Sequence, residues 1–426
     1  MPIEFYTLEP HREHVFFADR DQLQSCLEQS SMLFEAFDTA PPGRASVFVV
    51  KGEQLLKLRP QDWITREPHK SPFPGLFHPK EQSALVEKYI RQQPCYPFLR
   101  SIESGLISSQ GILLCRYFPS PLMKKMLLND LVQSCLKGIY FQYPSYTYGP
   151  FFSHEDRSML LDLSKFGIPV FWVDPSSKML LQYTPKPNKD SGMFVPEPLV
   201  NRFIESTLFG IYGSTLTQGH FEQELSLLLE GILEMRHRMR HPLLHRETPI
   251  ALVTGGGPGV MEVGNRLAKR LDILSCANIV DFRASQNLNI QEQSQNPYIE
   301  AKMTYRLDRL VERQAEFHLD FPIILTGGIG TDFEYCLEEV RRKVGSTSPT
   351  PVLLFGEIAY WKAKVTSRFQ QNLESGTIAH SEWVSNCFYC IQTARQGLSV
   401  YEKFFNGTLP IGPDHPPAKE GFMLAP

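Results

Sequence analysis

The sequence contains no run of about 18 apolar residues, the length that a helix needs to cross a bilayer. Its first residues, MPIEFYTLEPHREHVFF, include acids and a proline where a secretory signal would need an unbroken apolar segment. These two absences argue against a membrane partner and against export. We therefore expect a soluble, cytoplasmic protein.

An excess of basic charge is also missing. The 426 residues include 43 Lys and Arg against 46 Asp and Glu, which gives a formal net charge of −3. Proteins that bind duplex DNA neutralise its phosphates with clustered cations, so the sequence predicts no DNA partner. The pattern G-x-x-x-x-G-K-[ST] does not occur, which excludes the P-loop nucleotidases. Small molecules or other proteins are the expected partners.

Cysteine is sparse, with 8 residues in the chain. Cys115 in GILLCRYF and Cys276 in ILSCANIV lie in apolar, strand-like runs, as reduced core cysteines do. Cys387 and Cys390 form a C-x-x-C, but a zinc site needs further ligands at a suitable spacing, and no second close Cys or His pair accompanies them. We expect no metal site.

Histidines recur every four residues at His237, His241 and His245, a spacing that would align metal ligands on one face of a helix. Pro242 interrupts that helix, because proline removes a backbone donor and clashes with the preceding turn. The run EMRHRMRHPLLHRE is more typical of cations at a helix C-terminus, where the helix dipole favours positive charge.

The composition, 42% apolar and 21% charged, is that of a globular protein with ordinary cores. A seam lies at Thr184–Pro198, TPKPNKDSGMFVPEP, where four prolines prevent a continuous helix or central strand. The sequence therefore predicts an N-terminal α/β domain at 1–185 of unknown role, a linker at 186–202, a second domain at 203–403 and an irregular, Pro/Gly-rich tail at 404–426.

Before the seam, short β-rich runs alternate with helical stretches, which predicts an α/β domain. One helix, Ser153–Lys165, opens with Ser-His-Glu-Asp, a capping pattern in which the serine oxygen can accept a free amide. We find no catalytic constellation in this half. The expected strands are 45–50, 111–117, 138–143 and 167–174.

After the seam, strands and helices alternate more sharply. Repeated strand–helix units with short apolar strands predict a mostly parallel sheet with helices on both faces, a Rossmann-like arrangement. Apolar residues at helical spacing predict helices over 221–235 and 261–271, and the GGIGTDFEYCLEEVRRK stretch opens another. The expected strands are 207–212, 249–254, 273–281, 322–325 and 352–355.

Three glycine-containing loops follow strands of this sheet. In a parallel sheet, such loops gather on one edge, where helix N-termini expose unpaired amides and the positive ends of their dipoles. Glycine lets the backbone approach an anion closely, and Thr331 can add a hydroxyl. Any one of these turns can equally be a tight connection. The candidate residues are Gly213 and Ser214; Gly255, Gly256, Gly257 and Gly259; and Gly327, Gly328, Gly330 and Thr331.

The second loop departs from the dinucleotide fingerprint G-x-G-x-x-G. Glu262 stands where the third glycine would let helix and strand pack closely, and a carboxylate is a poor neighbour for pyrophosphate. Asp281 ends the following strand, where a ribose-binding acid would lie. Binding of a dinucleotide such as NAD therefore remains a minor alternative.

Taken together, the motifs resemble those of one family. GGGPGVME at 255–262, NPYI at 296–299 and GGIGTDFE at 327–334 are similar, in order and spacing, to the GGGxxGxM and PGGxGTxxE signatures of the Lonely Guy (LOG) family. Gly213-Ser214 and LLFGEIAYW at 353–361 also look like features of this family. The resemblance covers about residues 203–400.

The resemblance implies a Rossmann-like phosphoribohydrolase that cleaves a nucleoside 5′-monophosphate such as AMP to free base and ribose 5-phosphate. It implies no metal or redox cofactor, and a homodimer or higher homo-oligomer. The GGIGT loop would hold the 5′-phosphate, and Glu334 would stabilise the oxocarbenium character of the sugar or activate water. Met261 would lie near the nucleotide, although a core methionine fits that position almost as well.

Two positions depart from the family. Thr326 replaces the proline before the paired glycines, and Val311-Glu312 stands, in an ungapped count, where the family carries an Arg-Lys pair. Arg313 is the first candidate for the missing catalytic arginine, and Arg309 is the second. Because both lie roughly opposite Val311 on a helix, a sensor or scaffold that binds a nucleotide without turnover remains the alternative to the enzyme.

Overall fold

A computed structural model of the chain describes most of the C-terminal half and a smaller part of the N-terminal half. The chain divides into two compact units: unit 1 comprises Met1–Pro185 and Gly192–Pro198, and unit 2 comprises Lys186–Ser191 and Leu199–Pro426. The described residues are 2–6, 45–51, 110–119, 127–134, 136–145, 149–187, 191–214, 221–281, 295–306 and 318–426, with single positions or short pieces at 34, 84, 87–88, 90–92, 100, 103–104, 124 and 189.

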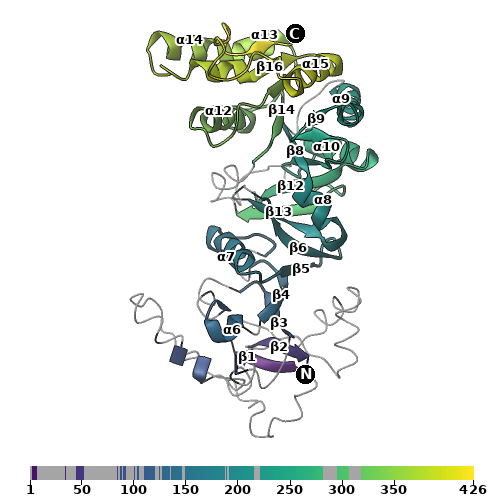
Figure 1. Cartoon of the computed structure of the whole chain (residues 1–426), viewed down its shortest axis with the longest axis vertical. Coiled ribbons are helices and arrows are strands. Elements are labelled where there is room, and N and C mark those ends of the chain that lie inside the picture. Colours follow the sequence, from purple (N-terminus) through teal and green to yellow (C-terminus); the bar gives the residue numbers. More distant parts are fainter. Residues whose placement is uncertain are drawn as a thin grey trace, which may run out of the picture. The chain divides into compact units, whose positions relative to one another are not determined.

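Unit 1 contains a mixed sheet in which the strands lie in chain order from β1 to β7 (Figure 1). β3, β4 and β5 are parallel neighbours, and the remaining pairs are antiparallel. Parallel neighbours need crossover connections, and α6 and α7 lie in the two crossovers. The elements are β1 (Pro2–Tyr6), β2 (Ala45–Lys51), β3 (Gln110–Tyr117), α6 (Asp130–Gln133), β4 (Leu136–Tyr143), α7 (His154–Lys165), β5 (Val170–Asp174), β6 (Met179–Pro185) and β7 (Gly192–Pro196).

Helix α7 begins as its sequence predicts. The Ser153 hydroxyl accepts the amide of Asp156 at 3.1 Å, and the Asp156 carboxylate accepts the amide of Ser153 at 2.9 Å, which completes a capping box. Nearby, the buried rings of Phe141, Phe152 and Trp172 meet at centroid distances of 5.8–6.1 Å. Aromatic packing therefore supplies much of the core of unit 1.

The stretch predicted as a linker, 186–202, carries regular structure instead. Gly192–Pro196 forms β7, which is buried throughout and pairs with β6. Lys186 is anchored in unit 2, where its ammonium group donates to the carbonyl oxygens of Phe203 and Ile204, both at 2.8 Å. Burial lowers the pKa of Lys186 to about 8. Pro196 is the last residue of β7 and lies opposite Leu181 of β6, so a proline at the end of the strand does not prevent its pairing, and the composition of the stretch was misleading.

Unit 2 contains a sheet in the order β13-β12-β11-β8-β14-β15-β16-β17, in which all neighbouring strands are parallel. The predicted α/β class, with a mostly parallel sheet in this half, is confirmed. The strands are β8 (Thr207–Tyr212), β11 (Ile250–Thr254), β12 (Leu274–Asp281), β13 (Ala301–Arg306), β14 (Phe321–Leu325), β15 (Val352–Phe355), β16 (Phe388–Ile391) and β17 (Met423–Leu424), beside a separate pair of β9 (Arg240–His241) and β10 (Leu244–His245).

Helices cover both faces of this sheet. On one face, α9, α10 and α15 pack on side chains such as Phe209, Leu252 and Phe321 in one buried cluster. On the other face, the ring of Tyr335 of α12 packs in a tilted arrangement against Phe388 of β16, with 4.7 Å between the ring centroids. Figure 1 shows α9 and α10 on one side of β8 and β14, and α12 on the other. The helices of this unit are α8 (Val200–Glu205), α9 (Phe221–Arg236), α10 (Val260–Arg270), α12 (Ile329–Lys343), α13 (Ile358–Trp361), α14 (Ser367–Glu374) and α15 (Ala394–Phe405), with a 3-10 turn at Glu382–Cys387 and a π-helical turn at Lys362–Thr366. A further 3-10 turn, Glu197–Leu199, spans the division of the chain between Pro198 and Leu199.

The tail, predicted to be irregular, carries no helix or strand over residues 406–422, and it ends in the short β17, which pairs with β16. Asn386 holds the segment before it by donating to the Gly412 carbonyl at 2.9 Å, and the Tyr389 hydroxyl donates to the Pro410 carbonyl at 2.9 Å. The tail is thus part of unit 2. Within the described residues, no helix has the length and apolar character needed to span a membrane.

Candidate functional site

The three glycine loops follow three neighbouring strands, β11, β8 and β14, which run parallel. Their carboxyl ends therefore share one edge of the sheet. Leaving β13 aside, the order β12-β11-β8-β14-β15-β16 is 3-2-1-4-5-6 when the strands are counted along the chain. The chain reverses its direction of winding between β8 and β14, and ligands of doubly wound sheets bind at this reversal. The predicted loops flank it.

Two of the loops touch each other at the reversal. A Cβ atom placed on Gly213 would lie 3.2 Å from Val260 at the start of α10 and 3.3 Å from Leu325 at the end of β14. A Cβ atom on Gly327 would lie 3.3 Å from the amide nitrogen of Ser214 and would collide with the Thr331 side chain. The structure therefore brings together Gly213-Ser214, Gly327 and Thr331, and only glycine leaves room for this approach.

The second loop is held by a buried hydrogen-bond network. The Asn296 backbone amide donates to the Gly256 carbonyl at 3.0 Å, and its side-chain amide donates to the Gly257 carbonyl at 3.1 Å. Thr254 donates to Asn265 at 2.6 Å and accepts the Gly256 amide at 3.0 Å. In a trans peptide the N–H points away from the preceding C=O, so the Gly257 amide faces away from Asn296. Asn296, in the NPYI motif, thus orients the loop.

Two helix N-termini open at this edge. The N-cap residues of α10 and α12 are Gly259 and Gly328, so neither helix begins with a side-chain cap of its own. The first-turn amides of a helix have no partner within the helix, and the helix dipole adds positive potential there. At α12, Gly328, Ile329 and Gly330 are all exposed. The arrangement can bind an anion such as a phosphate.

The amide of Gly327, in the loop predicted to hold the phosphate, already has a hydrogen-bond partner. The Tyr360 hydroxyl accepts that amide at 3.0 Å and donates to the Gly327 carbonyl at 2.8 Å. Tyr360 lies on α13, within the LLFGEIAYW stretch, which the sequence marked only as a feature of the family. Sequence reasoning therefore missed Tyr360 as a residue that fixes the loop.

Glu334 lies on α12 three residues after Thr331, and its side chain is half-buried. Thr331, Glu334 and Glu338 follow one another at i, i+3 and i+7, so they share one side of the helix. Thr331 and Glu338 are buried. That side of α12 faces the protein, which places Glu334 within one helical turn of the glycine loop.

Glu338 holds a buried charge next to the site. Its carboxylate accepts from Arg341 at 2.7 Å and from Arg342 at 2.6 Å, and Tyr212 donates to it at 3.3 Å. Two guanidinium groups and a hydroxyl satisfy the carboxylate, as a buried charge requires. Since Tyr212 ends β8, this network fixes α12 against the strand next to the winding reversal.

Glu262 is tolerated in place of the third fingerprint glycine because α10 approaches the sheet most closely at a different residue. Gly264, two residues later, is the position where helix and sheet approach closely: a Cβ atom there would lie 2.8 Å from Ile211 and 3.3 Å from Thr254. Met261 is half-buried in the first turn, a position that fits either of its two predicted roles. The packing glycine is thus displaced along the helix, and Glu262 remains at the loop.

The candidate arginines, Arg313 and Arg309, lie outside the described residues, as do Val311 and Glu312. Asp281 ends β12, but its side chain is likewise not described. The structure therefore brings the glycine loops and Glu334 to one edge, and it leaves the arginine and the ribose-binding acid as predictions.

The cysteines and the histidine that the sequence raised as metal ligands lie in packed parts of unit 2. Burial raises the pKa values of Cys387 and Cys390 to about 11, so both thiols are protonated at neutral pH. His241 lies in the β9–β10 pair, and its ring contacts Phe405 at 5.2 Å. In the part of the chain that the structure describes, no group of three or more His, Cys, Asp or Glu residues could hold a metal ion.

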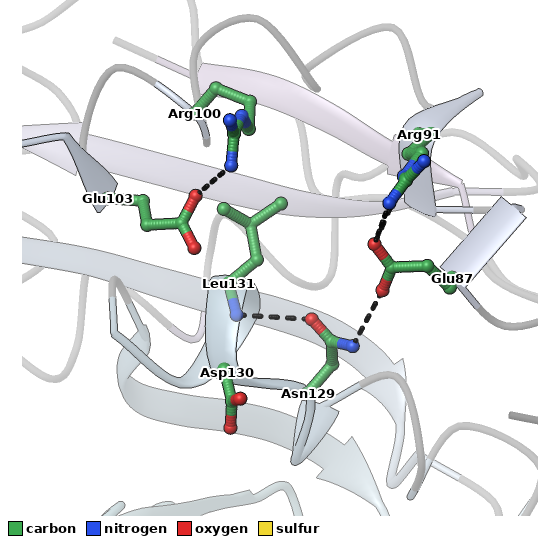
Figure 2. A pocket seen from close by; sticks show the side chains of 7 residues that line it. All are labelled: Glu87, Arg91, Arg100, Glu103, Asn129, Asp130 and Leu131. Carbon is green, nitrogen blue, oxygen red and sulfur yellow. Dashed lines mark hydrogen bonds and ion pairs between the residues drawn. The ribbon is translucent and has the colours of Figure 1, made fainter.

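Unit 1 has a pocket of about 360 Å³ on its own surface. Figure 2 shows that its charged side chains pair with one another: Arg91 with Glu87 at 3.0 Å, and Arg100 with Glu103 at 2.5 Å. Asp130 adds a further negative charge. Because each arginine already has a carboxylate partner, this pocket offers a phosphate less positive potential than the loops of unit 2.

The fold and the loop arrangement define an α/β protein with a doubly wound parallel sheet and an amide-lined edge. No family model matches the sequence, and no curated protein matches it. Among solved structures, a molybdenum cofactor binding protein from the phototrophic bacterium Rippkaea orientalis is similar at 16% sequence identity, with a TM-score of 0.29. The similarity covers 47% of this chain and 97% of that chain. A similarity of this degree identifies no family.

Proposed function

We propose that the chain hydrolyses the N-glycosidic bond of a nucleoside 5′-monophosphate such as AMP, releasing free base and ribose 5-phosphate. The observation that carries the proposal is the meeting of Ser214, Gly327 and Thr331 at the winding reversal, with Glu334 one helical turn away. A phosphate-binding edge and a fixed carboxylate are the two elements that this reaction needs.

The 5′-phosphate would bind at the N-terminus of α12. The exposed backbone at Gly328 and Gly330 lets a phosphate approach the first-turn amides, and the Thr331 hydroxyl, which lies over Gly327, can add a further contact. These groups bind the phosphate in both ground and transition states. Their contribution is to position the sugar.

Glu334 would act on the sugar. Breaking the glycosidic bond develops positive charge on the anomeric carbon and ring oxygen, and a fixed carboxylate nearby stabilises this charge or accepts a proton from the attacking water. A half-buried carboxylate is suited to this, since its charge is screened less than that of an exposed one. Arg313 is proposed as the arginine that reaches the nucleotide, with Arg309 second.

A nucleotide-binding sensor or scaffold is the second candidate. The specific observation in its favour is the sequence Val311-Glu312 at the positions where the resembling family has its Arg-Lys pair. The loops alone would still bind a phosphate without an arginine. Catalysis and binding therefore need separate measurements.

The purified full-length chain should be incubated with AMP, GMP, CMP and UMP, and the products separated by chromatography. Equal amounts of free base and ribose 5-phosphate from at least one substrate are the expected result. Nucleotide binding by calorimetry without base release from any of them would reject the enzyme and support the sensor. If the chain neither binds a nucleotide nor releases a base, the enzyme and the sensor are both rejected.

We further propose that the chain forms a homodimer or higher homo-oligomer, with the nucleotide as its small-molecule partner. The proposed chemistry needs no metal or redox cofactor, because the carboxylate and the amides supply the required charges. We also propose the cytoplasm as the compartment where a nucleoside monophosphate is met.

A further inference from the structure

Unit 2 has a cavity of about 320 Å³ at the edge of its sheet opposite the glycine loops. The residues that line it come from the end of α9, from the turn after α10 and from the segments that lead into β8, β11 and β12. β11 begins at this cavity with Ile250 and ends at Thr254, so about 17 Å of strand separates the cavity from the second glycine loop. The cavity is therefore distinct from the proposed nucleotide site, and its volume is within the range of small-molecule sites.

Arg236, in the last turn of α9, lines the cavity with a donor that is not in use. Its Nη1 donates to the Thr248 carbonyl at 3.2 Å, whereas its Nε is buried and has no hydrogen-bond partner among the described residues. A buried donor without a partner needs an explanation. With Nη1 engaged, the Nε edge of the guanidinium remains, and this edge can bind a carboxylate through two parallel hydrogen bonds.

Glu247 lines the same cavity and is exposed. It directly precedes Thr248, whose carbonyl accepts from Arg236, so the two charged residues lie close together. They do not form an ion pair with each other, and neither of them has an ion-pair partner elsewhere in the described part of the chain. The cavity therefore presents one uncompensated positive group and one uncompensated negative group.

The other charges of the cavity argue against a phosphate ligand. Arg202 and Asp272 compensate each other, with 3.0 Å between Nη1 and Oδ1. Helices α9 and α10 both end here, at Arg236 and Arg270, so the negative ends of their dipoles add to the charge of Glu247. A ligand that is only an anion would meet this negative potential, whereas an ammonium group would be stabilised by it.

The rest of the lining is mainly apolar. Leu233 and Leu271 are partly buried and pack with one side against the buried cluster under α9 and α10. Pro249 and the first residue of β11 continue this surface. A hydrocarbon group that covers it is removed from water, which stabilises the complex.

We propose that this cavity binds a free amino acid with an apolar side chain. Arg236 would donate to its carboxylate, Glu247 would accept from its ammonium group, and Leu233 and Leu271 would contact its side chain. A free amino acid carries both charges on one carbon atom, as two neighbouring and unpaired groups of opposite charge require. The inference is independent of the glycine loops and goes beyond the proposed function.

The first test is calorimetric titration of the full-length chain with valine, leucine, methionine and phenylalanine. At least one of them is expected to bind. The tightest is then compared with the corresponding carboxylic acid, which lacks the ammonium group, and with the corresponding amine, which lacks the carboxylate. Both are expected to bind at least about tenfold more weakly, because hydrogen bonds between charged groups are among the stronger ones in proteins.

The second test assigns each charge of the ligand to its residue. Arg236→Gln should weaken binding of the amino acid and of the carboxylic acid alike, whereas Glu247→Gln should weaken only the amino acid. Arg238→Gln and Glu234→Gln are the matched controls, since both residues are exposed near the end of α9 and neither lines the cavity. Both controls should bind as the wild type does, and circular dichroism verifies that all four variants are folded.

The proposal is overturned if none of the four amino acids binds to the wild type. It is also overturned if the carboxylic acid binds as tightly as the amino acid, or if the controls lose as much affinity as Arg236→Gln and Glu247→Gln. None of these titrations uses a nucleotide, so failure of this inference is distinguishable from failure of the proposed reaction.

Discussion

The hydroxyl oxygen of Tyr360 lies 2.8 Å from the carbonyl oxygen of Gly327 and 3.0 Å from its amide nitrogen. One side chain thus occupies both polar groups of one residue in the loop between β14 and α12. Helix α13, which carries Tyr360, thus fixes the conformation of the loop. The amides that remain for a ligand are those of the first turn of α12. Tyr360 is therefore a positioning residue.

Replacing Tyr360 with Phe should weaken substrate binding. Two hydrogen bonds of about 0.5–1.5 kcal/mol each are lost, and the loop gains freedom. Because the phosphate is bound in both ground and transition states, KM should rise about tenfold while kcat changes little. Steady-state kinetics with AMP measures both constants.

Tyr389→Phe is the matched control for this variant. It removes one hydrogen bond, which the Tyr389 hydroxyl donates to the Pro410 carbonyl at 2.9 Å, and neither residue belongs to the glycine loops. It should lower stability without moving KM. An unchanged KM in Tyr360→Phe, or an equal rise in both variants, would remove Tyr360 from the account.

Gly330→Ala separates ligand binding from folding. A Cβ atom on Gly330 meets nothing within 4 Å, and alanine is favoured over glycine inside a helix by about 1 kcal/mol. The melting temperature should therefore stay the same or rise. If the phosphate approaches the amides here, the added methyl group should raise KM about tenfold.

Gly256→Ala should behave in the opposite way. Gly256 has φ of 75°, and its Cβ atom would lie 2.7 Å from Ile279 and 3.0 Å from Ala277. We expect a loss of about 1–3 kcal/mol in the free energy of unfolding. A Gly330→Ala chain with unchanged KM would show that phosphate does not approach α12 at that point.

Asn296→Ala should be strongly destabilising. Asn296 is buried, and its side-chain amide donates to the backbone carbonyl of Gly257 at 3.1 Å and to the side-chain oxygen Oδ1 of Asn265 at 3.0 Å. The variant removes this donor from the Gly257 carbonyl, whereas Asn265 Oδ1 still accepts from Thr254, and leaving a buried acceptor unpaired costs about 1–3 kcal/mol. Urea denaturation measures the loss. Asn372→Ala, which removes one exposed bond from Thr377, should change stability by less than about 0.5 kcal/mol, and equal losses would show that the network is not special.

Stability should depend on the protonation of His241. Burial lowers the pKa of this imidazole from its ordinary value of 6.5, and its Nδ1 accepts the Leu243 amide at 3.1 Å, which requires an unprotonated nitrogen. As the pH falls through 6.5, the unfolded chain takes up a proton before the folded chain does. The free energy of unfolding should therefore fall between pH 7.5 and about pH 5.

His241→Asn isolates this contribution, because an asparagine oxygen can accept the same amide and does not titrate. Between pH 7.5 and pH 5.5, the melting temperature of the wild type should fall further than that of His241→Asn. Parallel pH profiles would show that His241 is protonated alike in the folded and unfolded chains.

Much of the fold could be predicted because its strands are short, apolar and bounded by turn residues. Thr207–Tyr212 and Val352–Phe355 form strands with the expected bounds, and the capping pattern at Ser153 starts α7 as expected. These features depend on neighbours in the sequence. Gly192–Pro196 was missed because the four prolines of the stretch Thr184–Pro198 indicated a linker, whereas pairing with β6 determines its structure.

The site could be predicted to the level of its loops. Glycines after parallel strands indicate the edge where amides gather, and the structure brings Gly213-Ser214 against Gly327 there. The supports of the loops depend on distant elements. Tyr360 lies 33 residues after Gly327, and Asn296 lies 39 residues after Gly257, so no local pattern connects them.

The central claim is tested most directly by release of adenine from AMP by the wild type and by Glu334→Gln. The account predicts that the wild type releases adenine and ribose 5-phosphate in equal amounts. It predicts that Glu334→Gln binds AMP with similar affinity but releases adenine at least about 100-fold more slowly, because the amide cannot stabilise positive charge or accept a proton. If Glu334→Gln releases adenine at the wild-type rate, the proposed role of this carboxylate is contradicted. If the wild type releases no adenine, the proposed reaction is contradicted.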